Sequence, residues 1–228
     1  MFMMDPLYMV LVLPAILLAL FAQMKVKTSF AKYSAVRASR GLDAGAVSRM
    51  LLDKFGLQRV RIERVSGELT DHYDPRGKVL RLSDSVGGSS SIAAIGVAAH
   101  EVGHAMQDKE GYIPLSIRNT FVPVASIGST AAIPLFLIGL FMGLGPLVNI
   151  GIFLFSGVVL FHLITLPVEF DASARALKAL RGAGTLTQGE IVGAKNVLNA
   201  AAMTYVAATL VAIMNLLWLV MRSQGRRN

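Results

Sequence analysis

The chain has 228 residues, of which 54% are hydrophobic and 16% are charged, and its formal net charge is +8. Such an apolar composition excludes an ordinary soluble domain and indicates a membrane protein. We do not expect nucleic-acid binding, because the basic residues gather beside apolar segments, where they set membrane topology and meet anionic lipid. The chain has no cysteine, so any transition-metal site must combine histidine with aspartate or glutamate.

Four apolar segments are long enough to cross a bilayer, and none of them contains Lys, Arg, Asp or Glu. They are residues 6–24, 121–142, 147–166 and 200–221. The first segment lacks a preceding basic residue and a convincing small-residue cleavage site, so we expect it to be a retained anchor.

Basic residues follow the first span closely and none precedes it, so the positive-inside rule places the amino terminus outside and the first loop in the cytoplasm. The second and third spans then form an outside hairpin that turns near residues 143–146. Three arginines after the fourth span end up outside, against the rule: Arg222, Arg226 and Arg227.

The loop after the first span has both helix and strand patterns. Residues 44–55 place apolar side chains on one helical face. Residues 59–65 and 78–83 alternate as half-buried strands do, and the turn residues 74–77 lie between them, so we expect a hairpin or two strands of a small sheet. A helix over residues 92–108 follows, with serines before it as a cap.

The last helix has its own start signal, because Thr187 and Glu190 have the spacing of a capping box. We expect this helix to continue into the fourth span. The glycine-rich residues 181–184 before it predict a flexible link.

The helix over residues 92–108 carries the most informative motif, HEVGH at residues 100–104. It holds two of the four histidines of the chain. Their spacing puts both imidazoles on one helical face, where His100 and His104 can bind one zinc ion. Glu101 projects from the same turn but off the line of the histidines, so it can act as general base on a zinc-bound water without being a ligand.

A catalytic zinc site needs a third protein ligand, and Glu169 is the best candidate because it lies where the third span returns to the side of the first loop. It follows His104 by 65 residues, which shortens to about 19 when residues 121–166 are taken out. The transmembrane hairpin therefore resembles an insertion between two halves of one site. Pro167 fits the first turn of a new helix, with Thr165 as its cap.

At these residues the chain resembles the bacterial neutral zinc metallopeptidases of the membrane, the YugP-like family of HExxH zincins. The resemblance covers nearly the whole chain. Its motifs are GELTDHYDPR (residues 67–76), SIAAIGVAAHEVGHAMQ (91–107) and LPVEFDAS (166–173). It implies a zinc-dependent endopeptidase in the bacterial membrane, with His100 and His104 as ligands and Glu101 as catalytic base. The similarity to glutamate-zincins supports Glu169 as the third ligand.

Three further residues are candidates for supporting roles. Asp171 and Ser173 can accept a hydrogen bond from a ligand histidine. Related membrane zincins often carry an aspartate four positions after the ligand glutamate, where this chain has Ser173, so the residue that orients the imidazole stays open. His72 could stabilise an oxyanion or contact the metal, although a turn histidine satisfied by neighbouring carboxylates is the simpler interpretation. The strand at 78–83 could hold an extended peptide by backbone pairing.

Two other functions compete with a membrane-anchored endopeptidase. An intramembrane site-2-type protease also carries HExxH, but its motif helix spans the bilayer. A non-enzymatic zinc-binding scaffold would not need Glu101. The resemblance and the ligand set imply one zinc ion, a peptide or membrane-protein substrate, and contact with the lipid bilayer, with the oligomeric state open.

We therefore predict a predominantly α-helical integral membrane protein with four transmembrane helices and a small α+β zincin-like catalytic domain. The predicted parts are a transmembrane helix (1–24), a soluble domain with the motif (25–118), a transmembrane hairpin (119–168), a third-ligand helix with a linker (169–199), and a transmembrane helix with its tail (200–228). We expect a multi-pass protein of the bacterial inner membrane with its site on the cytoplasmic side.

Overall fold

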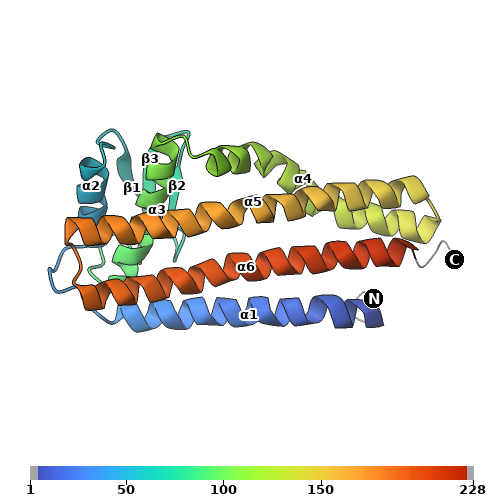
Figure 1. Ribbon diagram of the computed structural model, residues 1–228, viewed down its shortest axis with the longest axis horizontal. Coiled ribbons are helices and arrows are strands. Elements are labelled where there is room, and N and C mark those ends of the chain that lie inside the picture. The colour runs from blue at the N-terminus through green and yellow to red at the C-terminus, as the bar shows by residue number, and fades with distance from the viewer. Residues whose placement is uncertain (1–4, 225–228) are drawn as a thin grey trace. The chain divides into compact units, whose positions relative to one another are not determined.

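The computed structural model describes residues 5–224 (Figure 1). The chain forms two compact units. The membrane unit comprises the described residues of Met1–Gln23, Ser116–Pro167 and Met203–Asn228. The sheet unit comprises Met24–Leu115 and Val168–Ala202. The two segments of the sheet unit therefore flank the hairpin that the sequence marks as an insertion.

Among the described residues, four helices are long and apolar enough to cross a membrane, which confirms the predicted spans. They are α1 (Pro6–Ser34), α4 (Ile113–Met142), α5 (Gly145–Ala183) and α6 (Gln188–Gln224). In an apolar stretch of 18 residues within each helix, only 17% to 28% of the residues are buried. Most side chains of these spans therefore face outward, as expected for helices that are solvated by lipid.

Aromatic packing joins the first and last spans within the membrane unit. The ring of Trp218 lies 5.4 Å from Tyr8 and 5.8 Å from Phe136, centroid to centroid. Its indole N–H donates to the Asp5 carboxylate over 3.2 Å. The start of α1 and the end of α6 therefore lie together (Figure 1).

The Asp5 carboxylate also forms an ion pair with Arg222, one of the three arginines that lie outside in the predicted topology, against the positive-inside rule. Arg222 lies 3.6 Å from Asp5, nitrogen to oxygen. Arg226 and Arg227 lie outside the described residues. The orientation of the chain in the membrane stays a prediction.

The sheet unit contains a three-stranded sheet in the order β1-β3-β2. Its strands are β1 (Arg61–Val65), β2 (His72–Asp74) and β3 (Val79–Ser83). The sequence predicts two strands of a small sheet or a hairpin at residues 59–65 and 78–83. Two strands of a small sheet are confirmed as β1 and β3, and the hairpin between them is wrong, because β1 runs parallel to β3. The hairpin is instead β2–β3, whose turn is closed by the Asp74 carboxylate accepting the backbone N–H groups of Arg76 and Gly77.

The central position of β3 corrects a functional prediction. Both of its edges are occupied, by β1 on one side and by the short strand β2 on the other. The prediction that residues 78–83 bind a substrate by backbone pairing is therefore wrong, because Val79–Arg81 are paired on both sides and the N–H of Ser83 donates to the Asp71 carboxylate. The strand that the sequence analysis missed, β2, lies at the edge of the sheet.

Side-chain caps begin the helices of the sheet unit. The hydroxyl of Ser91 accepts the N–H of Ala94 at the start of α3 (Ile92–Lys109), as predicted for the serine-rich residues before this helix. The capping box of α6 is also confirmed, because the Glu190 carboxylate accepts the N–H of Thr187 over 2.7 Å. The other oxygen of this carboxylate accepts the N–H of Ser39 over 2.6 Å.

Helix α5 runs without a break from the membrane unit into the sheet unit. The predicted helix start at Pro167 is wrong, since Pro167 lies inside α5. Thr165 does not cap a helix either, because its hydroxyl donates to the carbonyl of Phe161 one turn earlier. A proline in a helix removes one backbone hydrogen bond, and helices at the membrane tolerate this loss when side chains and neighbours support them.

The core of the sheet unit surrounds α3, whose neighbours include α2 (Ala44–Lys54), the sheet, the end of α5 and the start of α6 (Figure 1). Glycines let two of these helices approach closely. A Cβ atom at Gly103 would lie 2.4 Å from the backbone oxygen of Ala172 on α5. A Cβ atom at Gly96 would lie 3.3 Å from the side chain of Ala194 on α6. The motif helix is therefore fixed against the part of α5 that carries Glu169.

Candidate metal centre

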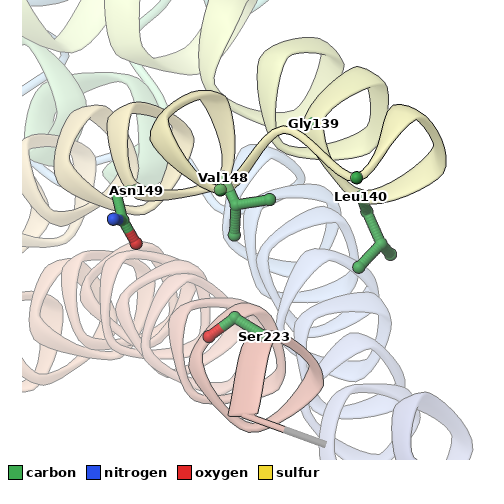
Figure 2. Close-up of a pocket in the computed structure, with 7 residues that line it drawn as sticks. Gly139, Leu140, Val148, Asn149 and Ser223 are labelled. Atoms are coloured by element: carbon green, nitrogen blue, oxygen red, sulfur yellow. The ribbon is translucent and has the colours of Figure 1, made fainter. Parts of the chain in front are cut away.

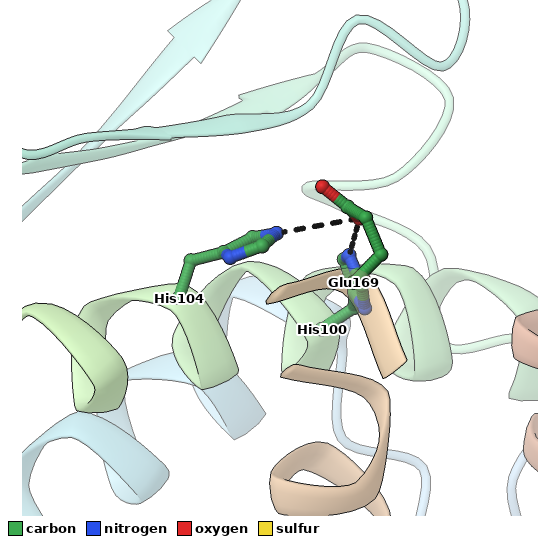
Figure 3. Close-up of side chains that lie close together, drawn as sticks. All are labelled: His100, His104 and Glu169. Carbon is green, nitrogen blue, oxygen red and sulfur yellow. Dashed lines mark hydrogen bonds and ion pairs between the residues drawn. The ribbon is translucent and has the colours of Figure 1, made fainter. Parts of the chain in front are cut away.

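Two histidines of α3 and one glutamate of α5 converge in the sheet unit (Figure 3). The Nε2 atoms of His100 and His104 lie 3.2 Å and 3.6 Å from the same oxygen of Glu169, Oε2. One ligand atom from each residue lies within 4.8 Å of the others. These three residues could therefore hold a metal ion.

The donor set fits zinc. Zinc bonds to imidazole nitrogen and carboxylate oxygen are about 2.0–2.2 Å long, so neighbouring ligand atoms of a tetrahedral site lie roughly 3.3–3.5 Å apart. The distances of 3.2 Å and 3.6 Å from the two Nε2 atoms to Glu169 Oε2 bracket this separation. The side chains of His100 and His104 are 15% and 11% exposed to solvent. This partial exposure suits a site that leaves one position open for water.

The charge state of Glu169 suits a ligand. Burial alone would raise the pKa of this carboxyl group, but hydrogen bonds and charge from His100 and His104 lower it well below its usual range. Its side chain is only 4% exposed. A buried carboxylate of this kind needs cationic or hydrogen-bonding partners, and the two imidazoles, or a cation between them, supply these.

Glu101 lies beside the cluster but is not one of its members. Its carboxylate is buried, and Oε2 accepts the backbone N–H of Tyr73 on β2 over 3.0 Å. Burial raises the pKa of Glu101 to about 7, the neighbouring charge of His100 opposes this rise, and the charges of Glu169 and Asp71 add to it. A carboxyl group with a pKa near neutrality can both take up and release a proton.

The Nδ1 atoms of the two imidazoles face different partners. For His100 the partner is the Ser173 hydroxyl at 3.1 Å. For His104 it is the Gln107 side-chain oxygen at 3.0 Å. The remaining predicted candidate, Asp171, meets neither histidine and accepts the Gln107 amide instead, over 2.8 Å.

The sequence pattern alone did not single out Gln107. Its spacing could have done so, because a glutamine three residues after a candidate ligand histidine lies on the same helical face. Its burial, at 0% exposure, and its partners on α5 could not be read from the sequence.

The structure places His72 outside the cluster. Its side chain is exposed on β2, next to Tyr73, whose side chain is buried and whose hydroxyl donates to Asp108 on α3. The two rings therefore point to opposite faces of the strand. Ring nitrogens of His72 lie 2.9 Å from the Thr70 carbonyl and 3.4 Å from the Arg81 guanidinium, so its neighbours differ from the carboxylates that we expected.

Two of the cavities in the described part of the chain are lined by none of the three cluster residues. One of about 210 Å³ lies in the membrane unit at the α4–α5 turn and at Ser223, and it is lined by glycines, apolar side chains, Asn149 and Ser223 (Figure 2). It has no titratable side chain and so offers no acid or base. The other, of about 580 Å³, lies in the sheet unit and is bordered by Asp171 and Arg175 among others.

Comparison with known proteins agrees with the chemistry of this cluster. A family described as "Putative neutral zinc metallopeptidase" matches residues 8–224. The chain is also 48% identical to the "Putative membrane protease YugP" of Bacillus subtilis (strain 168) over 215 residues, which cover 94% of this chain and 96% of that protein. No solved structure gives a significant match. The chain therefore belongs to the family that carries this description.

Proposed function

We propose that the protein is a membrane-anchored, zinc-dependent endopeptidase. One observation carries the proposal: a single carboxylate oxygen of Glu169 lies 3.2 Å and 3.6 Å from the Nε2 atoms of His100 and His104, with the buried Glu101 next to them in the chain. Two imidazoles and a carboxylate with an open fourth position are the ligand set of zinc hydrolases. His100, His104 and Glu169 hold one zinc ion in this proposal.

Zinc, when bound, polarises the substrate carbonyl and makes a water molecule acidic enough to attack near neutral pH. Glu101 takes the proton of that water as general base and then returns it to the departing amine. The bond from Tyr73 N–H to Oε2 fixes the orientation of the carboxylate, so proton transfer falls to Oε1.

The substrate in this proposal is an extended peptide that pairs with the outer edge of β2. The N–H of Tyr73 points away from β3 towards Glu101, and in an antiparallel pair the carbonyl of the same residue points the same way. This carbonyl can accept an amide of the peptide beside the metal ligands. The test is a series of extended peptide hydroxamates, used as inhibitors of peptide cleavage, each N-methylated at one amide. Methylation of the amide that donates to the Tyr73 carbonyl should abolish inhibition, because that N–H is lost. Equal potency across the series would rule out strand pairing.

The position of the motif helix disfavours intramembrane proteolysis. Helix α3 belongs to the sheet unit, and it is not one of the four candidate spans among the described residues. In this proposal the cleaved bond lies outside the hydrocarbon layer, and the positive-inside rule favours the cytoplasmic surface of the bacterial inner membrane.

The Glu101→Gln variant tests the enzyme against a zinc-binding scaffold. An amide cannot take the proton, so we expect the purified full-length variant to keep its zinc and lose cleavage of casein and of a labelled peptide library. Glu68→Gln is the matched control, because Glu68 is an exposed carboxylate of the same unit. Cleavage by the Glu101→Gln variant at the wild-type rate would overturn the proposal, and a complete lack of cleavage by the wild type would favour the scaffold.

A further inference from the structure

Gln107 has three polar contacts that the proposed chemistry does not use. This residue lies on α3 one turn after His104 and is 0% exposed. Its side-chain nitrogen donates to the carbonyl of Val168 and to the carboxylate of Asp171, each over 2.8 Å. Its side-chain oxygen lies 3.0 Å from His104 Nδ1.

The partners on α5 fix which way the amide of Gln107 points. A backbone carbonyl and a carboxylate can only accept hydrogen bonds, so the NH2 group must face them and the oxygen must face His104. The flipped amide would place its oxygen against two acceptors, so both hydrogen bonds would be replaced by repulsion between oxygen atoms. The orientation therefore follows from the chemistry of the neighbours.

This orientation selects the protonation site of His104. The Gln107 oxygen can only accept, so His104 Nδ1 must carry the proton and donate it. In a neutral imidazole the lone pair is then on Nε2, which is the atom that faces Glu169. The partner of His100 makes no such selection, since the Ser173 hydroxyl can donate or accept.

The same amide also ties the two helices of the cluster together. Its acceptors, Val168 and Asp171, lie on either side of Glu169 in the sequence of α5. Asp171 is held in turn by the Arg175 guanidinium over 2.5 Å, and Arg175 also pairs with Glu110 of the loop after α3. Gln107 thus connects the helix of both histidines to the segment that carries the carboxylate.

We propose that Gln107 is a positioning residue of the metal centre. It holds His104 in the tautomer whose Nε2 can bind a metal, and it fixes the distance between His104 and Glu169. This inference rests on the proposed zinc site and deepens it. Partners of this kind typically change metal affinity by about 10–100-fold when they are removed.

The test measures zinc affinity of the full-length protein in detergent by competition with a chelator. Gln107→Met keeps the size of the side chain and removes all three contacts, so we expect zinc to bind about 10–100-fold more weakly. Gln107→Glu keeps an oxygen that can accept from His104. Its second oxygen would face the carbonyl of Val168 and the carboxylate of Asp171, which are also acceptors, so we expect this variant to bind zinc more weakly as well. Leu180→Ala, a buried change in the same unit, should lower thermal stability and leave zinc affinity unchanged.

A spectroscopic readout separates positioning from general loss of structure. In zinc-loaded protein with 15N-labelled histidine, the chain has only four rings to assign. In the wild type the ring N–H proton of His104 should exchange slowly with water. In Gln107→Met its signal should shift or broaden, while the ring signal of His100 should keep its position. Both readouts use bound metal and do not depend on cleavage.

The outcomes distinguish this inference from the proposed function. If the wild type binds zinc and both Gln107 variants bind it equally tightly with an unchanged His104 signal, the positioning role is wrong and the zinc site stands. If the wild type itself binds no zinc, the proposed function is overturned and the role of Gln107 with it.

Discussion

Gly103 lies at a close approach of α3 and α5 at the candidate site, and Gly103→Ala adds one methyl group at this contact. The added Cβ would lie 2.4 Å from the oxygen and 3.0 Å from the carbonyl carbon of Ala172. Real contacts of a Cβ atom essentially never fall below 3.0 Å. The two helices must therefore separate locally by about 0.6 Å or more, and Glu169 moves with α5 because it lies one turn before Ala172.

This shift is large on the scale of a metal bond. Zinc–ligand distances hold within about 0.2 Å, so a displacement roughly three times larger should weaken zinc binding at least about tenfold. Two opposing effects set the change in stability, because overpacking costs about 1–3 kcal/mol while alanine gains about 1 kcal/mol over glycine in a helix. We expect a net loss of about 0–2 kcal/mol in the free energy of unfolding.

The assay is chelator competition for zinc on the purified full-length variants, beside a thermal unfolding curve for each. Gly96→Ala is the matched control on the same helix, because its Cβ would lie 3.3 Å from the side chain of Ala194, a contact that small adjustments can absorb. Its zinc affinity should equal that of the wild type. Equal zinc affinity in Gly103→Ala would show that the close helix approach does not set the position of Glu169.

Three further predictions concern residues around the site. Glu190→Gln should lower the free energy of unfolding at pH 7 by about 1 kcal/mol. Burial would raise the pKa of Glu190, but hydrogen bonds from backbone N–H groups lower it below 4.5, so the carboxylate stabilises the fold above that pH. A stability deficit of the variant that persists after acidification has protonated the carboxylate would contradict this prediction. His72→Ala should leave zinc content and peptide cleavage unchanged, and a large loss of kcat would return this residue to the site. Tyr73→Phe removes the bond to Asp108 and should cost about 1 kcal/mol of stability without changing zinc affinity, as thermal unfolding and chelator competition can check.

Local features of the sequence predicted local features of the fold. A spacing of four residues between His100 and His104 corresponds to about one helical turn, so one helix suffices to bring their rings together. Long apolar segments predict spans because backbone groups in lipid must bond within their own helix. Glu169 could be found because the chain must return from the membrane beside the first loop, which reduces the choice of partners.

The features that the sequence did not predict depend on contacts between distant elements. Parallel pairing of β1 with β3 depends on how the chain turns through β2, a strand of three residues that is too short to show a period. Pro167 fits both the first turn and the interior of a helix at the membrane, and only its neighbours decide between them. The partners of Gln107 depend on the register of α5 against α3, which no local pattern contains.

The most direct measurement is zinc-edge X-ray absorption of the purified full-length protein, made on the wild type and on Glu169→Ala. We expect the wild type to hold one zinc ion with two imidazole nitrogens at about 2.0–2.1 Å and carboxylate or water oxygens at about 2.0–2.2 Å. Glu169→Ala should lose the metal or show one oxygen ligand fewer. A wild type with a third imidazole in place of the carboxylate, or a Glu169→Ala variant with the wild-type coordination sphere, would contradict the proposed centre.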